Sequence, residues 1–403
     1  MWARVYAFGF LSSLYLDQFL WLVYLLHLAY SPAFIGIQYA LMQAGRLALD
    51  VPSSMFADRF GGRAVLVAGA LAKLVAAVLF LLAGFGPGYV LAGAFVTAIA
   101  LTLPSGVDVA YVRGLSEKVE GTGDEGVLMR RFADYVAMQR LASLGSGLLG
   151  GIIASVSFIW LYAAEAIGSL MMLVAAFSLP AGPAATGSGG SVPGLSAALH
   201  EIRQPVYRSL WGIGLTAAAL WALSSVGTEY SQAMLVALNL HPFAISLLFA
   251  GAGGAAWLAT LASGRLRQHT QGKLLRVAIW GYPLAAALRA AAAPRAPGAL
   301  AYAAGGMALG RGASGAASML LEQRIVTGAP RAMRATTLSG VNTLQMALQL
   351  VLFPLLGVLS GQAGVSAIFL ALTVGLLAAS LVLVRVLQGA APDGRPAAEG
   401  NRT

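Results

Sequence analysis

Ionisable side chains stand inside long apolar stretches of this sequence, and they are the residues best suited to do chemistry. The acids are Asp17, Glu165 and Glu229, and the bases are Lys73, Arg46, Arg140 and Arg311. A carboxyl group buried in a low dielectric favours its neutral form, so it can take up and release a proton when its surroundings change. Asp17 is the candidate for this role.

The rise of an α-helix, 1.5 Å per residue, places several of these charges at similar depth. Asp17 would lie roughly 20 Å from Arg4, and Arg46 would lie roughly 18 Å from Asp58. Asp17 and Arg46 are therefore expected near mid-depth on consecutive helices, where they could pair. The other residues expected near mid-depth are Lys73, Arg140 and Arg311. Glu165 is expected in the outer half of its helix, and Glu229 near the outer surface.

The elements that must position these charges are membrane helices. The 403 residues are 59% hydrophobic and only 10% charged, whereas soluble proteins are roughly a quarter charged. A spanning helix needs about 20 mostly apolar residues, and stretches such as Ala64 to Gly84 are apolar without the alternation that a membrane barrel would show. The chain has no cysteine and four scattered histidines, so no metal site is expected.

Twelve apolar stretches divide into six before a polar segment and six after it. Those before it are Val5 to Leu28, Pro32 to Ala57, Ala64 to Gly86, Gly88 to Val112, Phe132 to Ser155 and Phe158 to Leu179. Those after it are Ser209 to Leu240, Pro242 to Ser263, Leu274 to Ala293, Pro297 to Leu320, Thr336 to Leu359 and Val365 to Val386. The predicted units are a six-helix bundle (1–180), a cytoplasmic linker rich in Gly, Ser and Pro (181–206), a second six-helix bundle (207–388) and a polar tail (389–403).

The distribution of positive charge predicts the topology. With the N-terminus inside, most of the 25 lysines and arginines fall in cytoplasmic segments, and only Arg289 and Arg295 fall in outer loops. This bias predicts a multi-pass protein of the plasma (inner) membrane with both termini in the cytoplasm. It also explains the net charge of +10 without nucleic-acid binding, which would need a basic patch with interleaved aromatic residues.

The segment between the second and third stretches reads DVPSSMFADRFGGRAVL, from Asp50 to Leu66. It resembles the signature loop of the major facilitator superfamily, in which a Gly precedes an Asp, a basic residue, a Gly and further basic residues. The matching positions are Asp50, Pro52, Asp58, Arg59, Gly61 and Arg63. Two positions depart from the pattern, because Ser54 stands where the family has Gly and Gly62 stands where it has a basic residue.

The resemblance implies an all-α fold of twelve transmembrane helices in two six-helix bundles, and a transporter that works by alternating access. It also implies that the signature loop holds the two halves together on the cytoplasmic side and so acts as a gate. Asp50 and Asp108 lie within about three helical turns of the cytoplasmic loops, where they could make either gate contacts or substrate contacts. The segment Arg324 to Gln345 and the glycine-rich LGSGLLGG of the fifth stretch resemble the efflux-type, drug–proton antiporter branch. Close packing of helices explains these glycines equally well.

The expected function is proton-coupled export of a small organic molecule, with uptake by symport as the alternative. The predicted proton-coupling and substrate cavity comprises Asp17, Gln18, Arg46, Lys73, Arg140, Glu165, Glu229 and Arg311. The expected partners are the cargo, protons and the lipid bilayer; the chain is expected to be a monomer without a cofactor, driven by the proton gradient. A membrane-embedded transferase is disfavoured because no carboxylates or histidines cluster as a metal site would need. A non-transporting receptor is disfavoured by the buried charges of both signs.

Overall fold

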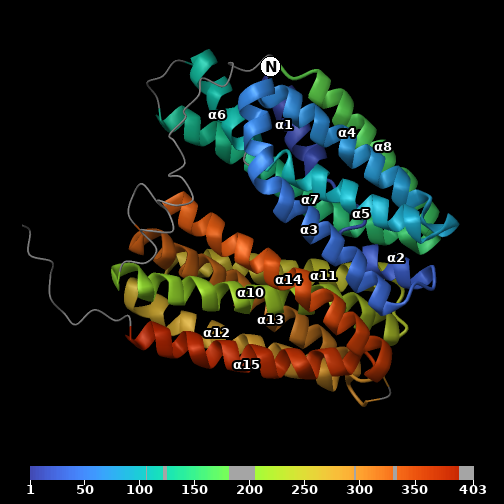
Figure 1. Cartoon of the computed structure of the whole chain (residues 1–403), viewed down its shortest axis with the longest axis vertical. Helices are drawn as coiled ribbons and strands as arrows, with labels where there is room; N and C mark the ends of the chain where they lie inside the picture. The colour runs from blue at the N-terminus through green and yellow to red at the C-terminus, as the bar shows by residue number, and fades with distance from the viewer. Residues whose placement is uncertain (106, 121–124, 181–204, 295, 330–333, 390–403) are drawn as a thin grey trace, which may run out of the picture.

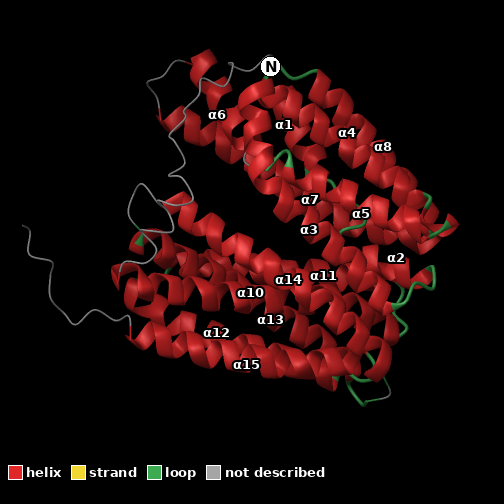
Figure 2. Cartoon of the chain, viewed as in Figure 1, coloured by secondary structure: helices red, strands yellow, loops and turns green. Residues whose placement is uncertain are grey.

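The computed structural model describes residues 1–105, 107–120, 125–180, 205–294, 296–329 and 334–389. These residues form helices and loops, with no strand among them (Figure 2). Most of the predicted linker (181–206) and of the predicted tail (389–403) lies outside the described residues. Seven of the described helices are long and apolar enough to cross a membrane, in agreement with a multi-pass membrane protein.

The first group of helices is built from the N-terminal half of the chain. It comprises α1 (Trp2–Ser12), α2 (Trp21–His27), α3 (Pro32–Phe60), α4 (Gly62–Leu81), the 3₁₀ turn η1 (Ala83–Phe85), α5 (Pro87–Thr102), α6 (Val107–Glu120), α7 (Glu125–Val156) and α8 (Phe158–Phe177). Within it, α4 packs against α5 and α8, α3 packs against α5, and α1 packs against α7 and α8.

The second group comprises α10 (Pro205–Ala237), α11 (Pro242–Arg265), α12 (Gln268–Ala291), α13 (Ala299–Gly328), α14 (Arg334–Ala363) and α15 (Val365–Gly389). Here α13 packs between α11 and α12, and α10 packs against α14 and α15. Figure 1 shows the two groups as separate bundles, blue to green above and yellow-green to red below.

The first predicted span, Val5 to Leu28, is not one helix, which corrects the sequence-based expectation. Helix α1 ends at Ser12 and α2 begins at Trp21, so that Ser13 to Leu20 form turns and irregular backbone between them. No proline or glycine lies in this break, and hydropathy could not reveal it. Asp17 therefore stands in the break and not on a helix.

The fourth predicted span, Gly88 to Val112, is also interrupted. Helix α5 ends at Thr102 and α6 begins at Val107. Pro104 lies between them, where its ring and missing N–H end a helix, so the sequence did carry a signal at this position. The other predicted spans each correspond to a long helix, and boundaries differ by a few residues.

The described parts of the bundles are in contact near α2. The main contacts join α3 with α14, α7 with α11, and α2 with α10. A Cβ atom on Gly36 of α3 would overlap the Phe353 carbonyl oxygen of α14, so the backbones approach as closely as small residues allow. In Figure 1 the bundles diverge away from α2 toward the end where α6 and the N-terminus lie.

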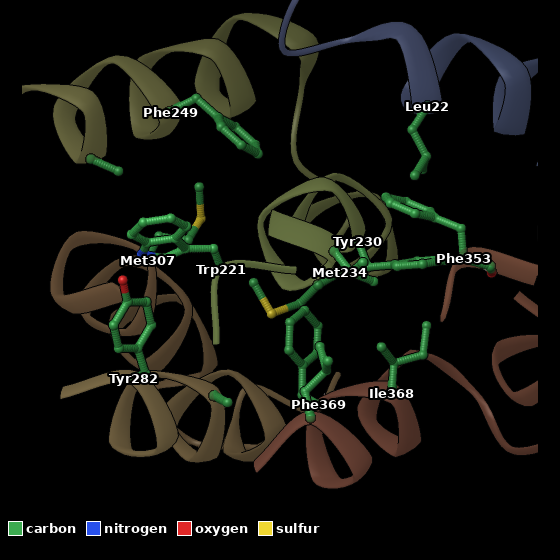
Figure 3. Packing of buried hydrophobic residues seen from close by; sticks show 14 of the residues in the cluster. Leu22, Trp221, Tyr230, Met234, Phe249, Tyr282, Met307, Phe353, Ile368 and Phe369 are labelled. Carbon is green, nitrogen blue, oxygen red and sulfur yellow. The ribbon is translucent and has the colours of Figure 1, made fainter. Parts of the chain in front are cut away.

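Buried aromatic and aliphatic residues fill the region where α2 and α3 meet the second bundle. Tyr230 of α10 stacks on Phe353 of α14 at 5.7 Å between ring centroids, and its hydroxyl donates to the Phe353 carbonyl oxygen at 2.9 Å. Figure 3 shows Leu22 of α2 beside this pair and Met307 between Phe249 and the helix of Tyr282. This core packs α10 and α14 against α2 and α3.

Candidate functional site

Lys73 of α4 and Glu165 of α8 form a buried ion pair beside the break between α1 and α2. The Lys73 Nζ atom lies 3.5 Å from Glu165 Oε1, and the two side chains are only 5% and 6% exposed. Two charges in an apolar interior are stable only when each has a partner and further hydrogen bonds.

Both members of the pair also bind the backbone of the break. Lys73 Nζ donates to the carbonyl oxygens of Leu14 at 2.6 Å and Leu11 at 3.4 Å, and the Leu16 amide donates to Glu165 Oε2 at 2.6 Å. Lys73 Nζ also lies 3.7 Å from the centroid of the Tyr15 ring. Backbone groups that leave a helix inside a membrane must find partners within the protein. The ion pair supplies those partners and so holds the break open.

Helix α7 supports the break from the other side through its glycines. A Cβ atom on Gly150 would overlap the Leu16 carbonyl oxygen, and one on Gly147 would overlap the Phe19 ring. Gly151, one residue on, faces Ser246 of α11 in the second bundle. The glycine-rich segment of the fifth span thus lets α7 touch both the break and the opposite bundle.

A cavity of about 650 Å³ lies against the break. Its walls include six of the predicted site residues, Asp17, Gln18, Lys73, Arg140, Glu165 and Glu229. Aromatic rings make up much of the remaining wall, from Tyr15, Trp21, Tyr39, Phe80 and Tyr162. The amide oxygen of Gln38, a residue only 2% exposed that also lines the cavity, has no hydrogen-bond partner. The cavity therefore offers stacking surfaces, both signs of charge and a free acceptor.

Asp17 and Arg46 do not pair, contrary to the sequence-based suggestion. Asp17 lies in the break beside Tyr162, and both line the cavity. Arg46 lies outside the cavity wall and donates to Gln43 Oε1 at 3.1 Å. Gln43 in turn donates to Gln349 of α14. Arg46 thus supports a contact between the bundles, because the break turns Asp17 toward α8 and not toward α3.

Glu229 is not at the outer surface, as the helix rise had suggested, but lies in the cavity wall. Its Oε2 atom accepts hydrogen bonds from Trp21 Nε1 at 2.8 Å and from Gln232 Nε2 at 3.1 Å. The Gln232 Oε1 atom accepts from the Leu22 amide at 3.1 Å. Two side chains of α10 therefore bind the first turn of α2, and this contact crosses from one bundle to the other.

Of the remaining predicted cavity residues, Gln18 and Arg140 line this cavity and Arg311 does not. Gln18 accepts a hydrogen bond from Ser143 Oγ at 3.4 Å, and Arg140 is an exposed part of the cavity wall. Arg311 lies in the second bundle, outside this cavity. It lines a small cavity of about 10 Å³ together with Arg289. Arg289 was expected in an outer loop, but it is buried in helix α12 with 4% of its surface exposed.

The signature loop makes its described contacts within the first bundle. Gly61 has φ of +81° and joins α3 to α4, a conformation that costs glycine little. Arg63 donates to the Phe177 carbonyl oxygen at the end of α8, and Arg59 lies over the ring of its neighbour Phe60. Asp50 is a partly buried residue of α3. The side chain of Asp58 lies outside the described part of the chain.

Asp108 of α6 binds two side chains of α7. Its Oδ2 atom accepts hydrogen bonds from the Tyr135 hydroxyl and from Gln139 Nε2, both at 3.2 Å. Gln139 lines the cavity. Asp108 is thereby connected to the cavity wall through a single amide side chain.

Neither the family models nor the curated protein sequences include a match to this chain. Solved structures do match over nearly the whole chain. The nucleoside transporter NupG has a TM-score of 0.77 at 14% identity, with 96% of this chain and 99% of that chain covered. PepTSo, a transporter of the POT family, has a TM-score of 0.72 at 12% identity, with 96% and 97% covered. A D-xylose–proton symporter has a TM-score of 0.67 at 16% identity, with 94% and 96% covered.

The chain therefore has the twelve-helix fold of the major facilitator transporters, an all-α membrane fold. The fourteen described α-helices are compatible with twelve spans, because α1 and α2 share the first span and α5 and α6 divide the fourth. These structural neighbours are transporters of small molecules and not enzymes. At identities this low, the structural similarity establishes the fold only. The cargo and the direction of transport must be inferred from the site itself.

Proposed function

We propose that this protein is a secondary active transporter that exports a small organic molecule in exchange for protons. One observation carries the proposal: a single cavity of about 650 Å³ holds two carboxyl groups and a lysine of the first bundle together with Glu229 of the second. A cavity with wall residues from both halves can change its access when the halves rock. The two moving bodies would be residues 1–180 and 207–388, joined by the linker.

Asp17 is the proposed proton carrier. The Lys73–Glu165 pair is proposed to convert a change in the charge of Asp17 into a movement of the backbone of the break. Asp17 stands in the break that Lys73 and Glu165 hold in place. Protonation of either acid removes a negative charge that faces Lys73, which weakens the contacts of the pair with Leu14 and Leu16. The break could then move with the arrival of a proton. It adjoins the cavity and leads into α2, which contacts α10.

The proposed cargo is an amphipathic organic molecule with a planar ring. Tyr15, Trp21, Tyr39 and Tyr162 offer ring faces, and Gln18, Gln38 and Gln139 offer amide groups for its polar edge. A volume of about 650 Å³ is within the usual range for small-molecule sites. Nucleosides belong in the first panel of candidates, because the fold is similar to that of a nucleoside transporter.

The signature loop, with Asp50, Asp58, Arg59, Gly61, Arg63 and Asp108, is the proposed cytoplasmic gate. The bundles touch near α2 and the start of α3, which is the outer end in the predicted topology. The structure would then have its cavity open toward the cytoplasm. We propose a monomer in the plasma membrane, with both termini inside and no cofactor other than the proton gradient.

The test is transport in liposomes. Ligands would first be found by the rise in unfolding temperature that they cause, and each would then be added to reconstituted protein under an imposed pH gradient with a pH-sensitive dye inside. We expect cargo-driven proton flux in the wild type. Asp17→Asn should abolish the flux while the unfolding temperature stays near that of the wild type. A matched control is Asp134→Asn, because Asp134 of α7 binds Tyr6 and lies outside the cavity.

Three results would count against the proposal. Absence of proton flux with every binding cargo would reject proton coupling, and normal flux in Asp17→Asn would remove Asp17 from its role. Movement of cargo and protons in the same direction would replace export by uptake symport.

A further inference from the structure

The second bundle contains a buried arginine, Arg289, and a partly buried one, Arg311, that share a small cavity. Arg289 of α12 and Arg311 of α13 line it with Thr228 and Ser231 of α10, Phe249 of α11, and Met307 and Gly310 of α13. No acidic residue lines it. Arginine is charged at every pH that a protein meets, so two positive charges face one polar space inside an apolar bundle. This cavity shares no lining residue with the large cavity beside the break.

Arg289 is held firmly but leaves part of its guanidinium free. Its Nη1 atom donates to the Gly227 carbonyl oxygen at 2.9 Å and to Ser231 Oγ at 3.2 Å, and its Nε atom donates to the Ala285 carbonyl oxygen at 3.1 Å. The structure gives its Nη2 atom no hydrogen bond within the described ranges. A Cβ atom on Gly310 would lie 3.3 Å from Nη2, so this free nitrogen lies beside a residue of the cavity wall.

Arg311 is the less satisfied of the two. Its Nε atom is buried without a hydrogen-bond partner, and among the described residues its guanidinium makes no hydrogen bond or ion pair. Glu229 interacts electrostatically with Arg311, but the hydrogen bonds of the Glu229 carboxylate are with Trp21 and Gln232. An unpaired charge in a membrane interior costs several kcal/mol, and an unpaired buried donor adds to that cost.

The volume of this space limits what could bind. The cavity measures about 10 Å³, room for about one particle of the size of water. A phosphate or a carboxylic acid would not fit, whereas a single monatomic anion would fit after a small movement of the flexible Met307 or Arg311 side chain. Phe249 and Met307 form the apolar part of its lining, and Figure 3 shows these two side chains near each other.

We propose that this cavity is a binding site for one halide ion, chloride under physiological conditions, held between Arg289 and Arg311. The free Nη2 of Arg289 and the Nε of Arg311 would donate to the anion, as would the Thr228 hydroxyl after rotation from its present acceptor, the Ser224 carbonyl oxygen. One negative charge there, together with Glu229, balances the two arginines. Bound chloride would thus stabilise α10, α12 and α13 as a unit and act as a structural ligand of the second bundle.

The proposal is tested by thermal unfolding of the purified full-length protein in detergent. Sodium chloride and sodium bromide would be titrated against sodium gluconate at constant ionic strength. We expect a saturable rise of a few degrees in the unfolding temperature, because a ligand that binds only the folded state stabilises it. Arg311→Gln should remove the halide dependence. Arg46→Gln should keep it, because Arg46 is an arginine of the first bundle that does not line this cavity.

A second variant and a direct measurement cover the case in which Arg311→Gln fails to fold. Thr228→Val keeps the side-chain shape and should weaken the apparent halide affinity several-fold. Crystals grown in bromide should show an anomalous scattering peak between the two guanidinium groups. A wild-type unfolding temperature that is independent of halide, or a cavity that contains only water in bromide crystals, would overturn the proposal.

Discussion

Lys73 Nζ lies 3.5 Å from Glu165 Oε1, and each side chain at the same time binds backbone groups of the break between α1 and α2. The pair therefore has two tasks in one place, since it neutralises two buried charges and partners the amide and carbonyl groups that the broken helix leaves free. Any change to one member therefore alters the hydrogen bonds that hold the backbone around Asp17.

Removal of either member of the pair should destabilise the protein strongly. Lys73→Met leaves the Glu165 carboxylate without its ion-pair partner, and Glu165→Gln leaves the Lys73 ammonium without its ion-pair partner; each loss is expected to cost about 3–5 kcal/mol. The double variant should recover part of this loss, because neither member of the pair is left charged without the other. The measurement is a double-mutant cycle by chemical or thermal unfolding. Additive losses in the double variant would contradict an interaction between the two residues.

Gly150→Ala should disturb the break without any change of charge. The added methyl group would overlap the Leu16 carbonyl oxygen, so either the break or α7 must shift. We expect reduced folded yield and loss of transport. Gly145→Ala on the same helix is the matched control, because a Cβ atom there meets no atom within 4 Å. Equal behaviour of the two variants would mean that α7 does not support the break.

Trp21→Phe should loosen the contact between the bundles at the closed end. The variant keeps the ring but deletes the donor to Glu229, and a hydrogen bond to a charged group is worth about 1.5–3 kcal/mol. The population should shift toward states in which α2 and α10 separate. Solvent access at Gln232→Cys, a position that is fully buried in this structure, would report this shift. Unchanged access in the Trp21→Phe background would show that the hydrogen bond does not hold the bundles together.

Single cysteines should reveal the topology directly, because the natural chain contains none. Phe85→Cys in η1 should react with a membrane-impermeant maleimide from outside the cell, and Arg59→Cys should react only from the cytoplasmic face. Both positions are exposed, with Phe85 at 81%. Arg140→Cys in the cavity wall should react from the cytoplasmic face when the protein has the conformation described. Labelling of Phe85→Cys and Arg59→Cys from the same face would reject the predicted topology.

The sequence by itself determined the class of fold, because long apolar stretches can be satisfied in a membrane only as helices. It also indicated which residues carry charge into the interior, and the structure places six of the eight predicted residues in one cavity wall. The signature around Asp58 and Gly61 pointed to the fold that the structural neighbours share.

Only the tertiary structure decided where the helices break and which charges meet. The break at Ser13 to Leu20 has no local signal, since it depends on Lys73 and Glu165, which are far away in the sequence. For the same reason, helix rise alone could not show that Asp17 and Arg46 do not pair. It also could not predict the hydrogen bond between Trp21 and Glu229. Depth along a helix follows from 1.5 Å per residue, but the direction in which a side chain points, and its partner, follow from how the helices pack.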